Sequence, residues 1–254
     1  MAIWAVAVFA RRPSTPRWRC WRNRSTAPEP SMPPSIATRQ MSLALMGAII
    51  VQLAAALWGR RLLGAEHAPA AMMLAYLVLP SLAAILWLWF AAVWREQDGW
   101  SRLGFVWIER RWLLRAVGLG LASLPALMLV TAITNPIFGP ARNPPLPFSG
   151  AAAWNQPSYL LMMLLGIVVL APLIEEMIFR GLLFGWLRRH LGLWQAAALA
   201  ALGHAILHFD LGAMPGLFTL FLFLAWIYEY SQSLWVPAVI HSVHNFIALQ
   251  LPQS

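Results

Sequence analysis

Two adjacent carboxylates and an arginine lie inside an apolar run and are the residues of this chain best suited to chemistry. The run, residues 167–189, reads IVVLAPLIEEMIFRGLLFGWLRR and contains Glu175, Glu176 and Arg180. An ionised side chain near the centre of a bilayer costs about 3 kcal/mol, whereas a Leu, Ile or Phe contributes only about 0.5 kcal/mol in return. These charges must therefore find partners inside a helix bundle, and such a cluster predicts a functional site.

The spacing within this cluster separates the roles of its two carboxylates. Glu176 and Arg180 are four residues apart and share one helix face, so a charge-assisted contact can keep Glu176 ionised. Glu175 points about 100° away around the helix and is free for chemistry. The alternative is a purely structural ion pair between two spans. Such a pair needs one acid, however, and the second carboxylate favours a general base or acid.

Two later apolar runs carry histidines at the same four-residue spacing. His204 and His208 share one helix face, and His241 shares a face with Asn245. Two histidines and a carboxylate can ligate zinc and leave a fourth position open. They can equally activate a water without metal, while Asn245 and one histidine donate to a developing oxyanion. The sequence allows a zinc cofactor but does not assign its ligands.

Composition places the chain among helical membrane proteins. It has 254 residues, 60% of them hydrophobic and 11% charged, with a mean hydropathy of +0.65. A soluble domain carries about 25% charged residues. The net charge of +9 comes entirely from arginines that flank apolar runs, which indicates membrane orientation and not nucleic-acid binding. Cys20 is the only cysteine, which excludes an intrachain disulfide and a thiolate metal cage.

The fold class predicted is an all-α polytopic membrane protein with about seven transmembrane helices, within a range of six to eight. Several runs come near the roughly 20 residues that a bilayer requires. The predicted spans are residues 42–63, 71–94, 113–134, 158–187, 191–209, 214–230 and 234–251. Residues 95–112 mix charge with Trp and Phe at helical spacing, which favours an amphipathic interfacial segment over a plain polar loop.

Three regions follow from this pattern. Residues 1–40, with seven arginines against one acid, predict a basic disordered tail, and translation beginning at Met32 or Met41 is the alternative. Residues 41–157 form the N-terminal transmembrane region with its interfacial segment. Residues 158–251 form the helical core that carries the polar clusters. Thirteen arginines near one set of span ends against three near the other predict a cytoplasmic N-terminus and, with it, insertion in the plasma (inner) membrane.

Together these clusters resemble the CPBP family of intramembrane metalloproteases, the CAAX-protease and bacteriocin-processing group also labelled Abi. Its signature is EExxxR, FxxxH and HxxxN on successive helices. In this chain EExxxR is residues 175–180, the second motif falls on His204–His208, and HxxxN is residues 241–245. His204 stands where the family usually has Phe. We expect His204 to replace a packing aromatic and not to add to the site.

The resemblance implies an intramembrane endopeptidase acting on a prenylated CaaX-type protein, a leader peptide or another membrane-associated substrate. By this resemblance Glu175 and His208 activate water, His241 and Asn245 stabilise the oxyanion, and Glu176 with Arg180 supports Glu175. The expected partners are thus a peptide or lipidated protein and membrane lipids, with no nucleic acid. Two alternatives stay open: a non-catalytic scaffold or bacteriocin self-immunity protein, and, less favoured, an ion-coupled transporter.

Overall fold

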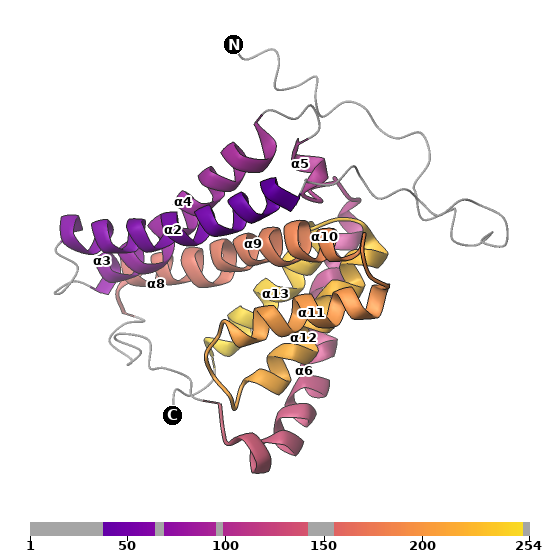
Figure 1. Ribbon diagram of the computed structural model, residues 1–254. Coiled ribbons are helices and arrows are strands. Elements are labelled where there is room, and N and C mark those ends of the chain that lie inside the picture. Colours follow the sequence, from indigo (N-terminus) through magenta and orange to yellow (C-terminus); the bar gives the residue numbers. More distant parts are fainter. Residues whose placement is uncertain (1–37, 64–68, 95–98, 142–154, 251–254) are drawn as a thin grey trace. The chain divides into compact units, whose positions relative to one another are not determined.

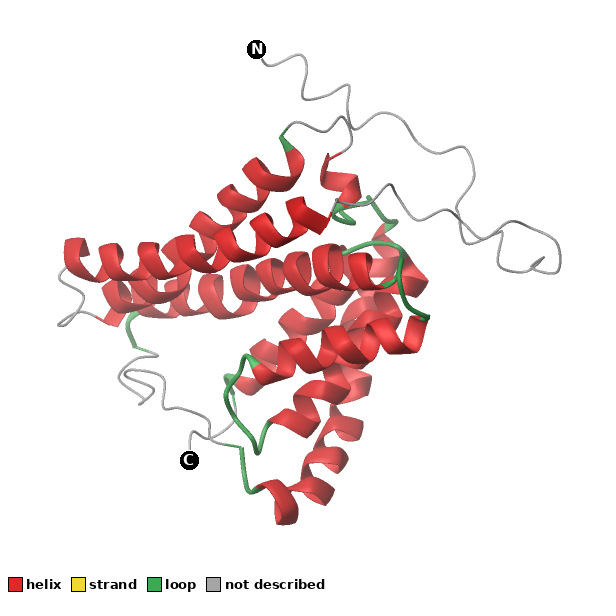
Figure 2. Ribbon diagram, viewed as in Figure 1, coloured by secondary structure: helices red, strands yellow, loops and turns green. Residues whose placement is uncertain are grey.

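The computed structural model describes residues 38–63, 69–94, 99–141 and 155–250, and within these ranges every regular element is a helix (Figure 2). This confirms the predicted all-α class. The predicted basic tail lies outside the described residues, apart from the start of the first helix. That helix begins at Thr38, three residues before Met41.

Several elements are short π-helical turns that continue an α-helix, and they are labelled η. The elements in chain order (Figure 1) are α2 (Thr38–Leu63), α3 (Pro69–Met73), η2 (Leu74–Val78), α4 (Leu79–Leu88), η3 (Trp89–Val93), α5 (Gly99–Arg102), α6 (Arg110–Phe138), α8 (Pro157–Met163), η4 (Leu164–Leu170), α9 (Ala171–Glu176), η5 (Met177–Phe184), α10 (Gly185–Leu187), α11 (Leu193–Ile206), α12 (Met214–Ser231) and α13 (Trp235–Ala248).

Among the described residues, four helical runs are long and apolar enough to cross a membrane, by length and composition. They are residues 39–63, 69–93, 110–138 and 157–187. Together with the shorter α11, α12 and α13, they are compatible with the prediction of about seven helices.

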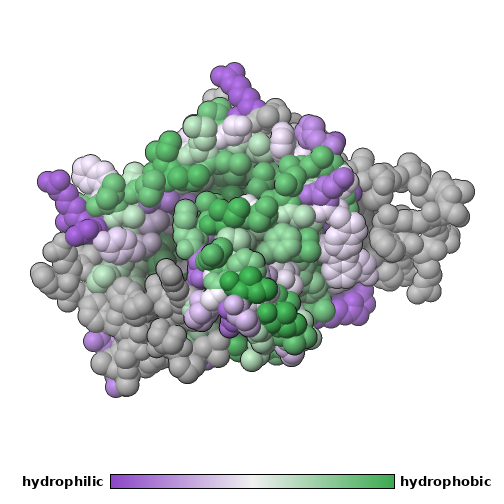
Figure 3. Space-filling model, turned by 60° about the horizontal axis from the view of Figure 1, so that its bottom comes forward, coloured by the Kyte–Doolittle hydropathy of each residue, from purple (hydrophilic) through white to green (hydrophobic). Residues whose placement is uncertain are grey.

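The outward faces of these helices are apolar. On α6, large side chains such as Leu114, Met128, Ile133 and Ile137 are mostly exposed, and hydrophobic residues cover much of the surface in Figure 3. A contiguous apolar surface of this extent is unusual for a protein in water. It is the surface expected of a bundle that faces lipid.

Small residues on α11 let α12 and the segment that carries the acidic pair approach closely. Five alanines of α11 are buried between α12 and the segment that carries the acidic pair (Ala196, Ala197, Ala200, Ala201 and Ala205). Small side chains bring helix backbones together where lipid gives no hydrophobic drive to association. α11 therefore packs closely against both neighbours.

The predicted interfacial segment is only partly helical. α5 is a single turn, and non-helical backbone follows it from Phe105 to Glu109. The helix stops because Gly104 has a φ of +92°, in the left-handed region that ends helices. The non-helical part then bonds the α12–α13 loop: Leu234 N–H donates to the Gly104 carbonyl at 2.8 Å, and Ser233 Oγ donates to the Val106 carbonyl at 2.7 Å.

These bonds place arginine-bearing segments at one end of the bundle. The α12–α13 loop follows Glu229, which accepts from Arg188 Nη2 at 2.8 Å. Gly181, one turn before α10, lies against the carbonyl of Leu103. The arginines around residues 102–111 and at 188–189 therefore share one end, as the orientation argument assumed.

Replacing Gly104 with Ala tests this junction. An alanine at this position would have to adopt the φ of +92°, which is strained for it, and its Cβ would meet the Tyr228 side chain. We expect the Gly104→Ala variant to lose more than about 1 kcal/mol of stability. Thermal unfolding in detergent measures this. The matched control is Gly118→Ala, since Gly118 is helical and has open space around it; a control as unstable as Gly104→Ala would contradict the assignment.

Candidate active site

The helix that carries Glu175 and Glu176 departs from the regular α-helical hydrogen-bond pattern just before this pair. The N–H of Ala171 donates to the Gly166 carbonyl, five residues back, and Pro172 has no N–H to donate. The Ile167 carbonyl thus lacks a donor at both the four-residue and the five-residue spacing. Asn245 of α13 supplies it, because its Nδ2 donates to the Ile167 carbonyl at 2.9 Å. Pro172 thus leaves one backbone carbonyl of this helix to be satisfied by another helix.

A buried arginine organises the polar centre. Arg180 and Glu176 are 1% and 0% exposed, and Nη1 of the arginine donates to Oε1 of the carboxylate at 2.8 Å. The arginine Nη2 also donates to the Phe221 carbonyl of α12 at 3.1 Å. Removing one member of a buried ion pair strands the other charge, at a cost of about 3–5 kcal/mol. The pair predicted from the four-residue spacing therefore exists within the acidic helix, and the bond from Arg180 to Phe221 joins this helix to α12.

Glu176 also orients His241 of α13. The distance from His241 Nδ1 to Glu176 Oε1 is 3.0 Å, and an ionised carboxylate can only accept, so Nδ1 carries a proton. His241 Nε2 then lies 3.5 Å from Glu175 Oε2, longer than an ordinary hydrogen bond. In the neutral ring this nitrogen holds a lone pair that faces Glu175. Carboxylates orient metal-ligating histidines in the same way.

His204 of α11 is held in the opposite tautomer. Its Nδ1 lies 2.9 Å from Arg180 Nη1, and a guanidinium has donors but no acceptor. The Nδ1 must therefore accept, and Nε2 carries the proton that it donates to Glu175 Oε2 at 2.9 Å. The ring is also stacked between two aromatics, with centroids 3.8 Å from Phe179 and 3.5 Å from Phe221.

His208 completes the group from the turn after α11. Its Nδ1 lies 3.1 Å from the His204 carbonyl, which can only accept, so Nδ1 is the donor and Nε2 keeps a lone pair in the neutral ring. The next residue, Phe209, has a φ of +52°, a rare value for a bulky residue. Such strain gathers at functional sites. His208 is exposed, whereas His204 and His241 are buried.

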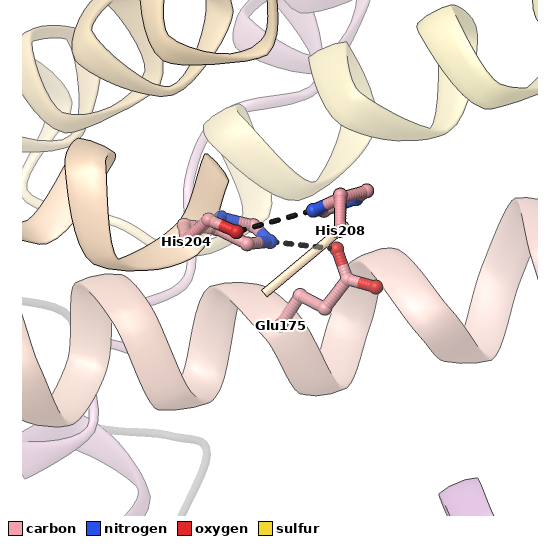
Figure 4. A group of neighbouring side chains, drawn as sticks. All are labelled: Glu175, His204 and His208. Carbon is pink, nitrogen blue, oxygen red and sulfur yellow. Dashed lines mark hydrogen bonds and ion pairs between the residues drawn. The ribbon is translucent and has the colours of Figure 1, made fainter. Parts of the chain in front are cut away.

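Glu175 is the carboxylate at which these side chains meet (Figure 4). Its side chain keeps 27% exposure while Glu176 has none, so Glu175 is the one that another molecule can reach. His204 bonds its Oε2, and among the described residues its Oε1 accepts no hydrogen bond. Glu176 is therefore the fully buried carboxylate, and Glu175, bonded by His204 at one oxygen, is the more accessible of the two.

The donor atoms fit a metal ion, with one restriction. Atoms of Glu175, His204 and His208 that could ligate lie within 4.8 Å of one another. His204 cannot be a ligand while Arg180 occupies its Nδ1, because its Nε2 is then protonated. The ligands that remain in this group are Glu175 and His208. His241 Nε2 lies 3.5 Å from Glu175 Oε2 but is not part of this group of donor atoms.

Five of the six predicted site residues lie on the three helices expected, and His208 lies in the turn after α11. Four of the others gather around Glu175, whereas Asn245 is bonded to the Ile167 carbonyl one turn beyond His241. The stacking of His204 agrees with the packing role expected for it, but packing alone omits its bonds to Glu175 and Arg180. The four-residue spacing between His204 and His208 was the signal in the sequence that His204 could belong to the site. It was given less weight than the phenylalanine that the family usually has at this position.

Comparison with protein families identifies this part of the chain. Residues 157–247 match the model of the family described as Type II CAAX prenyl endopeptidase Rce1-like. The match confirms the resemblance for this segment, which is similar to a family of proteases. No curated protein and no solved structure matches the chain significantly.

The bond from Asn245 to Ile167 can be tested by a double-mutant cycle with Pro172. We expect Asn245→Leu to lower stability by about 1–3 kcal/mol, because it strands a buried carbonyl. Pro172→Ala restores a backbone donor, so Asn245→Leu should cost less in that background. Thermal unfolding of the four proteins in detergent gives the coupling. Equal costs in both backgrounds would show that Asn245 acts elsewhere.

Proposed function

We propose that the protein is an intramembrane endopeptidase in which Glu175 activates the water that attacks a peptide bond. The observation that carries this proposal is the environment of Glu175, a partly exposed carboxylate with one oxygen fixed by His204 and the other without a hydrogen bond. The similarity of residues 157–247 to a family of proteases supports the same reaction class.

Each neighbouring residue then has a defined task. Glu175 takes the proton of the attacking water, and His208 Nε2, an acceptor in the neutral ring, faces the same space and holds that water. Glu176 and Arg180 fix the helix and orient His241. The proton on Glu175 is delivered to the leaving amine as the C–N bond breaks.

The oxyanion of the tetrahedral intermediate needs donors on the opposite side of the carbonyl. Asn245 has a second Nδ2–H beyond the one used by Ile167. A doubly protonated His241 would donate through Nε2, which lies 3.5 Å from Glu175 Oε2. A zinc ion held by Glu175 and His208 would supply the electrophile instead. Donation from His241 and polarisation by zinc are thus two variants of one hydrolysis.

The depth of the site indicates the substrate class. From Glu175 to Arg188 the helix rises about 20 Å at 1.5 Å per residue, so the carboxylate lies well below the arginine-bearing end. A peptide must enter the bilayer to reach it. A prenylated CaaX-type protein fits, since its lipid chain holds it in the membrane, and a leader peptide of a membrane-associated substrate is the alternative.

We propose an N-terminus on the cytoplasmic side of the plasma (inner) membrane.

Substitution of Glu175 tests the assigned base. In proteoliposomes, Glu175→Gln should lower cleavage of a fluorogenic farnesylated CaaX peptide at least 100-fold, because the amide cannot accept the proton. His208→Ala should lose activity as well. The matched control is Glu109→Gln at an exposed carboxylate, which should cleave at the wild-type rate. Retained cleavage in folded Glu175→Gln would overturn the role, and cleavage of an unprenylated leader peptide alone would change the substrate class.

Metal content separates the two variants of the mechanism. Since Glu175 and His208 belong to a group of donor atoms close enough together to hold a metal ion, we expect about one zinc per chain by elemental mass spectrometry. His208→Ala should lose it, and His190→Phe, at an exposed histidine away from the site, should not. Active protein without stoichiometric metal would contradict the zinc variant and leave the glutamate and histidine to activate water directly.

A further inference from the structure

We propose that His204 is a positioning residue for Glu175: a neutral imidazole, fixed by Arg180 on one nitrogen, that donates a hydrogen bond from the other and sets the direction of the catalytic carboxylate. This inference rests on the proposed function and adds a residue to its machinery. It also assigns His204 neither to the metal ligands nor to the groups that take a proton.

The tautomer follows from the chemistry of the partners. Arg180 Nη1 lies 2.9 Å from Nδ1 and can only donate. Protonation of Nδ1 would therefore oppose two N–H groups in a buried space, since His204 is 1% exposed. The single proton of the ring stays on Nε2, where Glu175 Oε2 accepts it at 2.9 Å.

Stacking fixes the orientation of the His204 ring plane, in addition to its tautomer. Phe179 from the acidic helix and Phe221 from α12 stack on its two faces, with interplanar angles of 8° and 7°. The acidic helix, α11 and α12 thus meet at the His204 ring. Arg180 contacts both the carbonyl and the ring face of Phe221. The Nε2–H therefore points in one direction only, toward Glu175.

Fixing Oε2 decides which oxygen of Glu175 does chemistry. The oxygen that accepts from His204 has lost part of its basicity to that bond, whereas Oε1 accepts no hydrogen bond from the described residues. Figure 4 shows the second carboxylate oxygen directed away from His204. A carboxylate held this way presents one oxygen to the attacking water, and such orientation is worth more in the transition state than in substrate binding.

The variant that isolates this role is His204→Phe. Phenylalanine keeps the stack between Phe179 and Phe221 and removes both hydrogen bonds. Loss of an outer-shell partner of this kind lowers activity about 10–100-fold, so we expect a fall of that size in kcat on the farnesylated peptide, with KM within about twofold. His204→Gln should recover part of the loss, because its amide can accept from Arg180 and donate to Glu175. His190→Phe is the matched control.

Wild-type kcat in folded His204→Phe, while Glu175→Gln is inactive, would overturn the inference and leave the proposed function standing. A second measurement needs no activity. In protein labelled with nitrogen-15 at histidine, the signal absent from His204→Phe should show a protonated Nε2 and an unprotonated Nδ1. A protonated Nδ1 would overturn the inference even if the protein cleaves neither peptide.

Discussion

The donor-only chemistry of one buried arginine determines the arrangement of this site. Arg180 cannot accept a hydrogen bond, so both partners of its Nη1, Glu176 Oε1 and His204 Nδ1, must accept. From this constraint the other proton positions follow in sequence: His204 donates to Glu175, and His241 donates to Glu176. The two adjacent carboxylates thereby receive different environments, one closed and one open, which is the asymmetry that acid–base chemistry requires.

The backbone of the helix that carries Glu175, Glu176 and Arg180 departs from a regular α-helix around the acidic pair. π-Helical turns precede and follow the acidic pair, and Pro172 leaves a carbonyl that α13 must satisfy through Asn245. In lipid every backbone polar group needs an internal partner, so this bond ties α13 to the acidic helix at the level of the site. The alanines of α11 act in the same direction, since they bring His204 and His208 within reach of Glu175.

The sequence predicted the positions of the helices better than the contacts between their side chains. Apolar length is a strong signal, so the helices of the described ranges fall where the hydropathy placed them, within a few residues. Spacing of four residues gave the Arg180–Glu176 pair. It could not give the tautomer of His204, which depends on atoms that α11 and η5 bring together in space. Gly104 likewise ends a helix at a φ that no periodicity reveals, which is why the segment around α5 was expected to be more helical.

The account predicts one carboxylate oxygen that faces the substrate and one that faces His204. The structure of the protein with a peptide phosphonate bound, a mimic of the tetrahedral intermediate, tests this most directly. We expect a phosphonate oxygen within hydrogen-bonding distance of Glu175 Oε1 and of His208, with the bond from His204 to Oε2 unchanged. A phosphonate bound away from Glu175, or one that displaces His204 from it, would contradict the account.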